Sequence, residues 1–167
     1  IHGYGGYSPE EDQPADIVEL SQTYKPLGLV REPGSAPSYS GGGYVLLPMM
    51  VEDVSGQDFD TYVRQQVFAP LGMVDSGFIE ADLPNRSAAF NYYRSEIGDL
   101  RDVALAAAGV YMSGDDMEAF LRAHLDGGGV LPAQWLDQAF APSEGTANIG
   151  MSYTRLETPH GLLIGHG

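Results

Sequence analysis

The chain contains no cysteine. This absence excludes disulfide bonds, metal sites built from thiolates and a cysteine nucleophile. It does not decide the compartment, because many exported proteins also lack cysteine, so a periplasmic or secreted location and a cytoplasmic one both stay open. The histidines are scattered through the sequence, and the His-Glu-x-x-His pattern of a zinc site is absent. We therefore expect no metal centre.

Basic residues are scarce, and only one of them, Lys25, is a lysine. The chain has 8 basic residues against 23 acidic ones and a formal net charge of -15. A charge of this sign and size opposes binding to nucleic acid or to an anionic membrane surface and favours solubility. We therefore expect no nucleic-acid partner.

Long apolar runs are also missing. No stretch reaches the roughly 18 apolar residues of a membrane helix. The first residues, IHGYGGYSPEED, show no basic region followed by an apolar run. We expect neither a membrane span nor a signal peptide in this chain. The apolar content of 43% predicts a globular protein rather than a disordered one.

Residues 31–72 join a turn region to two predicted helices. Pro33-Gly34 and Pro37 indicate turns. We expect the run Gly41-Gly42-Gly43 to let the backbone pass close to another group before the helix begins, and Tyr39 to lie on this tight loop. The segment thus predicts an exposed tyrosine on a rigid platform.

Apolar periodicity, with caps or prolines at the ends, predicts five helices. They cover residues 14–25, 44–55, 58–69, 113–126 and 132–141. We expect a glycine cap at Gly56 for the second helix, and a start at Asp58 and a stop at Pro70 for the third. Ser113-Gly114-Asp115-Asp116 predicts a capping box at the start of the fourth. The third helix has an inward stripe of Phe59, Tyr62, Val63 and Val67. The fourth has an apolar stripe of Met117, Phe120, Leu121 and Leu125.

The remaining segments predict less regular structure. Residues 73–91 show no sustained period and are expected to be irregular, and residues 92–102 show no clear pattern. From Gly150 the alternation of residue types predicts a strand, and Thr158-Pro159-His160-Gly161 predicts a turn into a second strand. A lone hairpin is marginal in water, so we expect it to need partner strands.

Four segments carry a resemblance to a known family. EPGSAPSYSGGGYVLL places Tyr39-Ser40-Gly41 where a Tyr-x-Asn motif would stand, and VEDVSGQDFDTYVRQQVFAPLGMVDSGF is similar to the segment after that motif. AAAGVYMSGDDMEAFLRAHLDGG and the terminal Gly165-His166-Gly167 are similar to two further elements. With these motifs the chain resembles the serine β-lactamase and penicillin-binding-protein superfamily, in the branch of class C β-lactamases, D-aminopeptidases and family VIII esterases.

The resemblance implies roles for individual residues. Tyr39 would be the proton-relay residue that serves a nucleophilic serine. His166 would stand at the position of the lysine of Lys-Thr-Gly and face the substrate carboxylate or the tyrosine. Gly167 would belong to the substrate-binding strand that supplies an oxyanion N–H. Ser40 is interpreted as a spacer within the motif. The resemblance implies no metal and no cofactor.

Two departures from the family pattern are visible. Gly41 occupies the place of the asparagine, so a side-chain amide is missing. The nucleophile of the family lies in Ser-x-x-Lys, and here Gln22 stands three residues before Lys25. No Ser-x-x-Lys exists in the sequence. We therefore expect an internal fragment of a larger hydrolase whose remaining chain is needed for activity.

By the resemblance, the fold class is α/β (α+β), a β-lactamase/DD-peptidase-like fold. We expect one partial domain over residues 1–167, with mainly loops and helices in 1–149 and a hairpin of the antiparallel sheet in 150–167. The expected function is hydrolysis of a small-molecule ester, peptide or β-lactam through an acyl-serine. The alternative is a non-catalytic, truncated or degenerate relative that binds a peptide or a partner.

Overall fold

The computed structural model describes residues 32, 34–36, 40–78, 83, 86–97, 105–127, 129–143, 146, 148–151 and 153–166. They belong to two compact units. Unit 1 contains the described part of Ser40–Phe120, and unit 2 that of Leu121–Gly167 and Leu29–Tyr39. In the described part of the chain, no helix is both long and apolar enough to cross a membrane. The helix expected at 14–25 lies outside the described residues.

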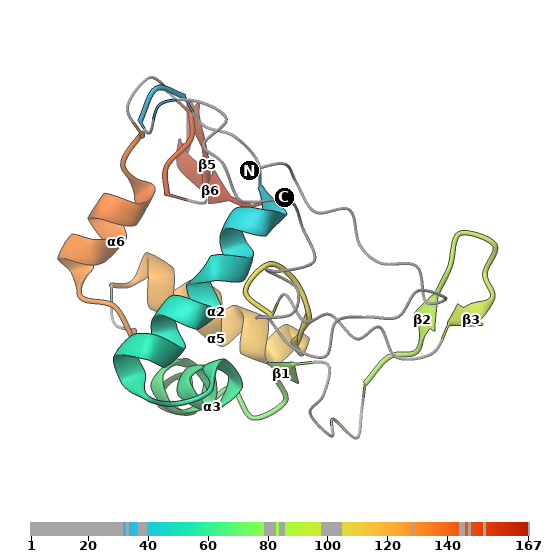
Figure 1. Ribbon diagram of the computed structural model, residues 1–167. Helices are drawn as coiled ribbons and strands as arrows, with labels where there is room; N and C mark the ends of the chain where they lie inside the picture. Colours follow the sequence, from blue (N-terminus) through green and yellow to red (C-terminus); the bar gives the residue numbers. More distant parts are fainter. Residues whose placement is uncertain are drawn as a thin grey trace. The chain divides into compact units, whose positions relative to one another are not determined.

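Helix α2 covers Gly41–Ser55 and is drawn in cyan in Figure 1. It begins at Gly41 rather than at Tyr44, so the prediction that the glycine run precedes the helix is wrong. The cause is an N-terminal cap: the Gly43 N–H donates a hydrogen bond to Ser40 Oγ at 3.0 Å. This bond satisfies a first-turn N–H group that has no partner inside the helix. The capping serine thus compensates for the poor helix propensity of glycine.

The far end of α2 follows the prediction. Gly56 adopts φ 68°, a left-handed conformation in which glycine is unstrained, and its N–H donates to the Glu52 carbonyl. Pro48 lies inside the helix and is fully buried. Part of the apolar pattern faces outward: among the described side chains of α2, the exposed large apolar ones are Leu47, Met50 and Val54.

The next helical stretch runs further than its sequence indicates. It consists of α3 (Phe59–Val63), the π-helical turn η1 (Arg64–Phe68) and α4 (Ala69–Leu71). The prediction that Pro70 stops the helix is wrong, since the stretch ends at Gly72 with φ 70°. A proline ring normally clashes with the carbonyl four residues earlier. The π turn makes the helix wider immediately before Pro70, and this gives room to the ring.

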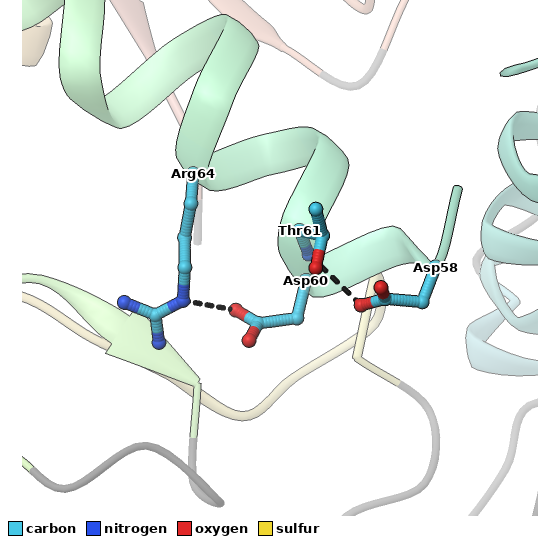
Figure 2. A network of polar contacts seen from close by, with 4 residues as sticks. All are labelled: Asp58, Asp60, Thr61 and Arg64. Carbon is cyan, nitrogen blue, oxygen red and sulfur yellow. Dashed lines mark hydrogen bonds and ion pairs between the residues drawn. The ribbon is translucent and has the colours of Figure 1, made fainter.

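Two carboxylates fix the start of α3. Glu52 Oε1, at the end of α2, accepts a hydrogen bond from the Phe59 N–H at 3.0 Å, which ties the two helices together. Asp58 Oδ1 accepts one from the Thr61 N–H at 2.9 Å, as predicted for an N-cap. Figure 2 shows Asp58 beside Thr61, and the Arg64–Asp60 ion pair of 2.7 Å one turn along. This partly exposed i,i+4 pair contributes about 0.3–0.5 kcal/mol.

Replacing Asp58 with Ala is expected to lower the free energy of unfolding by about 1 kcal/mol at pH 7. Hydrogen bonds from the Thr61 side chain and backbone hold the pKa of Asp58 below its ordinary value. A lowered folded-state pKa stabilises the fold above the unfolded-state pKa, about 3.9. The contribution is lost as the pH falls through the folded-state pKa. Urea unfolding of wild type and Asp58→Ala between pH 7 and pH 3 checks this.

Asp58→Asn is the matched control, because asparagine caps helices as well as aspartate does but carries no charge. It should stay within a few tenths of a kcal/mol of the wild type at pH 7. Equal losses for Asn and Ala would contradict the capping role. A loss for Ala that does not shrink at acid pH would contradict the lowered pKa of Asp58.

The core of unit 1 lies where the α3–η1–α4 stretch meets strand β1 and helix α5. Phe68, Met73 and Phe78 are buried, with 6%, 4% and 5% of their surfaces exposed. The ring of Phe78 lies 5.6 Å from that of Phe59 and 6.1 Å from that of Phe68. Half-buried side chains pack around them: Phe59, Val63, Val67, Leu71, Leu105, Met112, Ala119 and Phe120. The inward stripe predicted for this helix is therefore confirmed for Phe59, Val63 and Val67.

Two short strands flank this core. Strand β1 (Gly77–Phe78) pairs antiparallel with β4 (Val110–Tyr111), with Gly77 opposite Tyr111. Helix α5 (Gly114–Leu125) follows, and its Asp116 N–H donates to Ser113 Oγ at 3.1 Å, which confirms the serine half of the predicted capping box. The Asp116 carboxylate binds the turn before β1 instead, where it accepts hydrogen bonds from the Asp75 N–H (2.9 Å) and the Ser76 hydroxyl (2.6 Å).

The apolar stripe of α5 is only partly buried. Phe120 packs against the core. The other three members of the stripe are exposed: Met117 by 44%, Leu121 by 50% and Leu125 by 76%. The helix itself was predicted correctly; it ends at Leu125, two residues before Gly127, whose φ is 66°. Helical periodicity indicated the apolar face of α5, but it did not indicate which residues of that face are buried.

A small hairpin interrupts the segment that the sequence left irregular. Strand β2 (Ala89–Phe90) pairs with β3 (Glu96–Ile97). Asn91 Oδ1 accepts hydrogen bonds from the N–H groups of Tyr93 (2.9 Å) and Ser95 (3.0 Å), and these bonds close the turn. Together with β1, this hairpin shows that the prediction of irregular structure at 73–91 is wrong for its strand residues.

In its described residues, unit 2 contains the end of α5, helix α6 and the predicted hairpin. Helix α6 (Ala133–Phe140) buries Leu136 and ends before Pro142, as predicted. Strands β5 (Thr154–Thr158) and β6 (Gly161–Gly165) pair antiparallel from Thr158 opposite Gly161 to Thr154 opposite Gly165 (red in Figure 1). The hairpin prediction is confirmed. The expectation of a single domain over 1–167 stays a prediction.

Replacing Gly150 with Ala is expected to destabilise unit 2 by about 1–3 kcal/mol, as overpacking does. A Cβ at this position would lie 2.6 Å from the Ala139 carbonyl oxygen and 2.9 Å from that of Ala141. Both contacts are with backbone atoms, which cannot move aside easily. Gly165→Ala is the control, since a Cβ there meets no atom within 4 Å. Thermal unfolding that shifts equally in both variants would contradict the prediction.

Candidate active-site elements

The first candidate element is the N-terminus of α2. Tyr39, the predicted relay residue, lies outside the described residues. Its neighbour Ser40 is half-buried in an extended conformation and caps the helix through Oγ. This role agrees with the interpretation of Ser40 as a spacer, because its oxygen is already bonded to the Gly43 N–H. Gly41, in the place of the family asparagine, is the first residue of the helix.

The second candidate element is the end of β6. His166 follows Gly165 directly, and Gly165 is the last residue of the strand and pairs with Thr154. The side chain of His166 is exposed. Gly167 lies outside the described residues. Of the three predicted site residues, only His166 is described, so their assignment stays a prediction.

Other side chains that could bind a metal or transfer a proton have structural roles. Among the described residues, no group of three or more His, Asp or Glu side chains is placed to hold a metal ion. Asp116 is buried, with 5% of its surface exposed, and is bonded to the turn before β1. The ring of His124 lies 6.4 Å from that of Phe140 and 6.3 Å from that of Tyr153, and these contacts make it part of an aromatic cluster.

One contact near the second element was missed in the sequence. Arg155 Nη1 donates a hydrogen bond to the Phe140 carbonyl at 2.7 Å, across from strand β5 to the end of α6. The side chain of Arg155 is 18% exposed, far less than is usual for an arginine. The alternation of residues along the strand could have indicated this burial, since it places Arg155 on the inward face. That face pairs it with the half-buried Ile164 of β6.

Comparison with known proteins identifies one family. The family model described as Beta-lactamase matches residues 2–166. The curated penicillin-binding protein 4 of Amycolatopsis lactamdurans is 31% identical over 109 residues, which are 58% of this chain and 28% of that protein. The chain thus spans about a third or less of the length of these curated relatives.

Solved structures share the fold. The octameric penicillin-binding protein homologue from Pyrococcus abyssi superposes with a TM-score of 0.75 at 18% identity, over 95% of this chain and 39% of that one. The D-amino acid amidase from Ochrobactrum anthropi SV3 gives a TM-score of 0.70 at 25% identity, over 95% of this chain and 50% of that one. The predicted fold class, helices with antiparallel strands in a β-lactamase/DD-peptidase-like fold, is confirmed.

Proposed function

Because this chain belongs to the Beta-lactamase family, we propose that it is part of a serine hydrolase that cleaves ester or amide bonds through an acyl-serine. The observation that carries the proposal is the family match over residues 2–166, which includes Tyr39 and His166. The capped start of α2 supports it, since the Tyr-Ser-Gly motif stands where this long helix begins.

The proposed reaction needs a nucleophile outside this chain, because the sequence has no Ser-x-x-Lys. The serine Oγ attacks the substrate carbonyl carbon, and Tyr39 accepts the hydroxyl proton and passes it to the leaving group. Water then cleaves the acyl-serine with the same proton relay. His166 faces the substrate carboxylate, and the strand that contains Gly167 supplies an N–H to the oxyanion.

The substrate is a small ester or a D-amino-acid amide or peptide rather than a β-lactam. Gly41 removes the asparagine amide, and His166 replaces the flexible lysine ammonium with a shorter imidazole ring. Both changes alter groups that would hold a β-lactam for hydrolysis. The fold shared with a D-amino acid amidase at 25% identity supports an amide substrate.

The second candidate function is a non-catalytic binding module, favoured by the missing Ser-x-x-Lys. A fluorophosphonate probe and a penicillin probe separate the two candidates, because each forms a covalent bond only with an activated serine. We expect the longer parent protein to be labelled and the isolated 167-residue chain to remain unlabelled. A parent protein that neither probe labels would favour the binding module. Labelling of the isolated chain would overturn the assignment of the nucleophile to another segment.

A further inference from the structure

The C-terminal end of α6 is the anchor of the segment that leads into the hairpin. Arg155 Nη1 donates to the Phe140 carbonyl at 2.7 Å, and the Met151 N–H donates to the Ala139 carbonyl at 2.9 Å. The backbone of Gly150 passes so close to this helix end that it leaves no room for a Cβ. Three contacts thus fix Gly150, Met151 and Arg155 against the end of α6.

Of these three contacts, only the one from Arg155 is made by a side chain. Its guanidinium is mostly buried and bonds to a carbonyl at a helix C-terminus, where the helix dipole favours a positive charge. The backbone N–H of Arg155 donates to the Asn148 carbonyl at 2.7 Å. The second polar neighbour of the guanidinium, Glu157, is 3.7 Å away and 81% exposed, so that ion pair adds little. The bond to Phe140 is therefore the main contact of the side chain.

The register of the hairpin links the position of Arg155 to the position of the end of β6. Arg155 pairs with Ile164 and Thr154 with Gly165, and the next residue is His166. A shift of Arg155 against α6 moves this strand end with it, because paired strands move together. An error of about 1 Å in the position of a reacting group can cost about 10²-fold in rate.

We propose that Arg155 is a positioning residue, which sets the location of His166 by fixing the hairpin on the end of α6. The inference rests on the proposed function, in which His166 contacts the substrate. Arg155 itself touches neither the substrate nor the reacting atoms. It acts only through the strand pair.

The test is a double-mutant cycle in the full-length parent protein, with kcat and KM measured separately. Arg155→Met removes the hydrogen bond, Arg155→Lys keeps a donor, and Glu157→Gln is the control on the same strand face. We expect Arg155→Met to lower kcat/KM about 10-fold or more, Arg155→Lys to recover part of it, and Glu157→Gln to have no effect. In a His166→Ala background, Arg155→Met should cause no further loss. Equal losses in both backgrounds would overturn the proposal, because a merely structural defect acts independently of His166.

A second measurement does not depend on activity. The imidazole resonances of His166, followed by NMR in protein labelled at histidine, should shift in Arg155→Met and stay in place in Glu157→Gln. Unchanged resonances in Arg155→Met would overturn the proposal. If His166→Ala leaves kcat and KM unaltered, the role of His166 in the proposed function fails. The NMR result then still decides whether Arg155 positions this residue.

Discussion

Replacing Tyr39 with Phe in the parent protein is expected to lower kcat for ester or amide hydrolysis by about 10²–10⁴-fold, the usual contribution of a general acid–base group. The change removes only the phenol oxygen, so substrate binding and KM should change little. The residue stands immediately before the capped start of α2. Steady-state kinetics of hydrolysis measure the effect, and thermal unfolding verifies that the variant is folded.

Tyr92→Phe is the matched control for this substitution. Tyr92 is 94% exposed at the tip of the β2–β3 hairpin, where its ring meets that of Tyr93 edge to face. Loss of its hydroxyl should leave kcat and the melting temperature unchanged. A Tyr39→Phe variant with wild-type kcat would contradict the relay role and leave the tyrosine a packing residue.

Asp116→Ala is expected to give the largest loss of stability, about 3 kcal/mol, which is the cost of leaving buried polar groups without their charged partner. The carboxylate accepts hydrogen bonds from the Asp75 N–H and the Ser76 hydroxyl, and Ser76 is itself only 3% exposed. Alanine leaves the buried Ser76 hydroxyl and the partly buried Asp75 N–H without their acceptor. Urea unfolding of the variant measures the loss.

Asp115→Ala is the control within the same helical turn. Asp115 also lies in the first turn of α5, but it is exposed, so its removal costs only the helix-dipole term of about 0.3–1 kcal/mol. In a double-mutant cycle, Ser76→Ala should reduce the cost of Asp116→Ala, because one of the stranded donors is gone. Similar losses for Asp115→Ala and Asp116→Ala would refute the role of the buried carboxylate.

The helices could be predicted where their ends are determined by local chemistry. Gly56, Asp58 and Ser113 end or begin helices through contacts with residues three or four positions away, which a sequence displays directly. Pro70 misled the prediction because a π turn, which changes the helical period, has no simple sequence pattern. The strands of two residues, such as β2, are too short to show a period of two.

The site could be predicted only as a set of motifs. The family motifs indicated Tyr39, His166 and Gly167, whereas Arg155 belongs to none of them. Its contact with Phe140 joins residues 15 positions apart, and it depends on how β5 packs against α6. The bond from Ser76 to Asp116 spans 40 positions and was hidden for the same reason. Contacts of this kind follow from tertiary packing, which no local pattern encodes.

The cap at Ser40 limits how the centre of the Tyr-Ser-Gly motif can evolve. Its oxygen bonds to the Gly43 N–H, and the first turn of α2 consists of glycines that have little helix propensity of their own. We therefore expect threonine, aspartate and asparagine, the other side chains with a short acceptor, to replace Ser40 at the lowest cost in stability. A requirement for serine at this position would therefore reflect the start of α2. Catalysis would depend on Ser40 only through the helix that it caps.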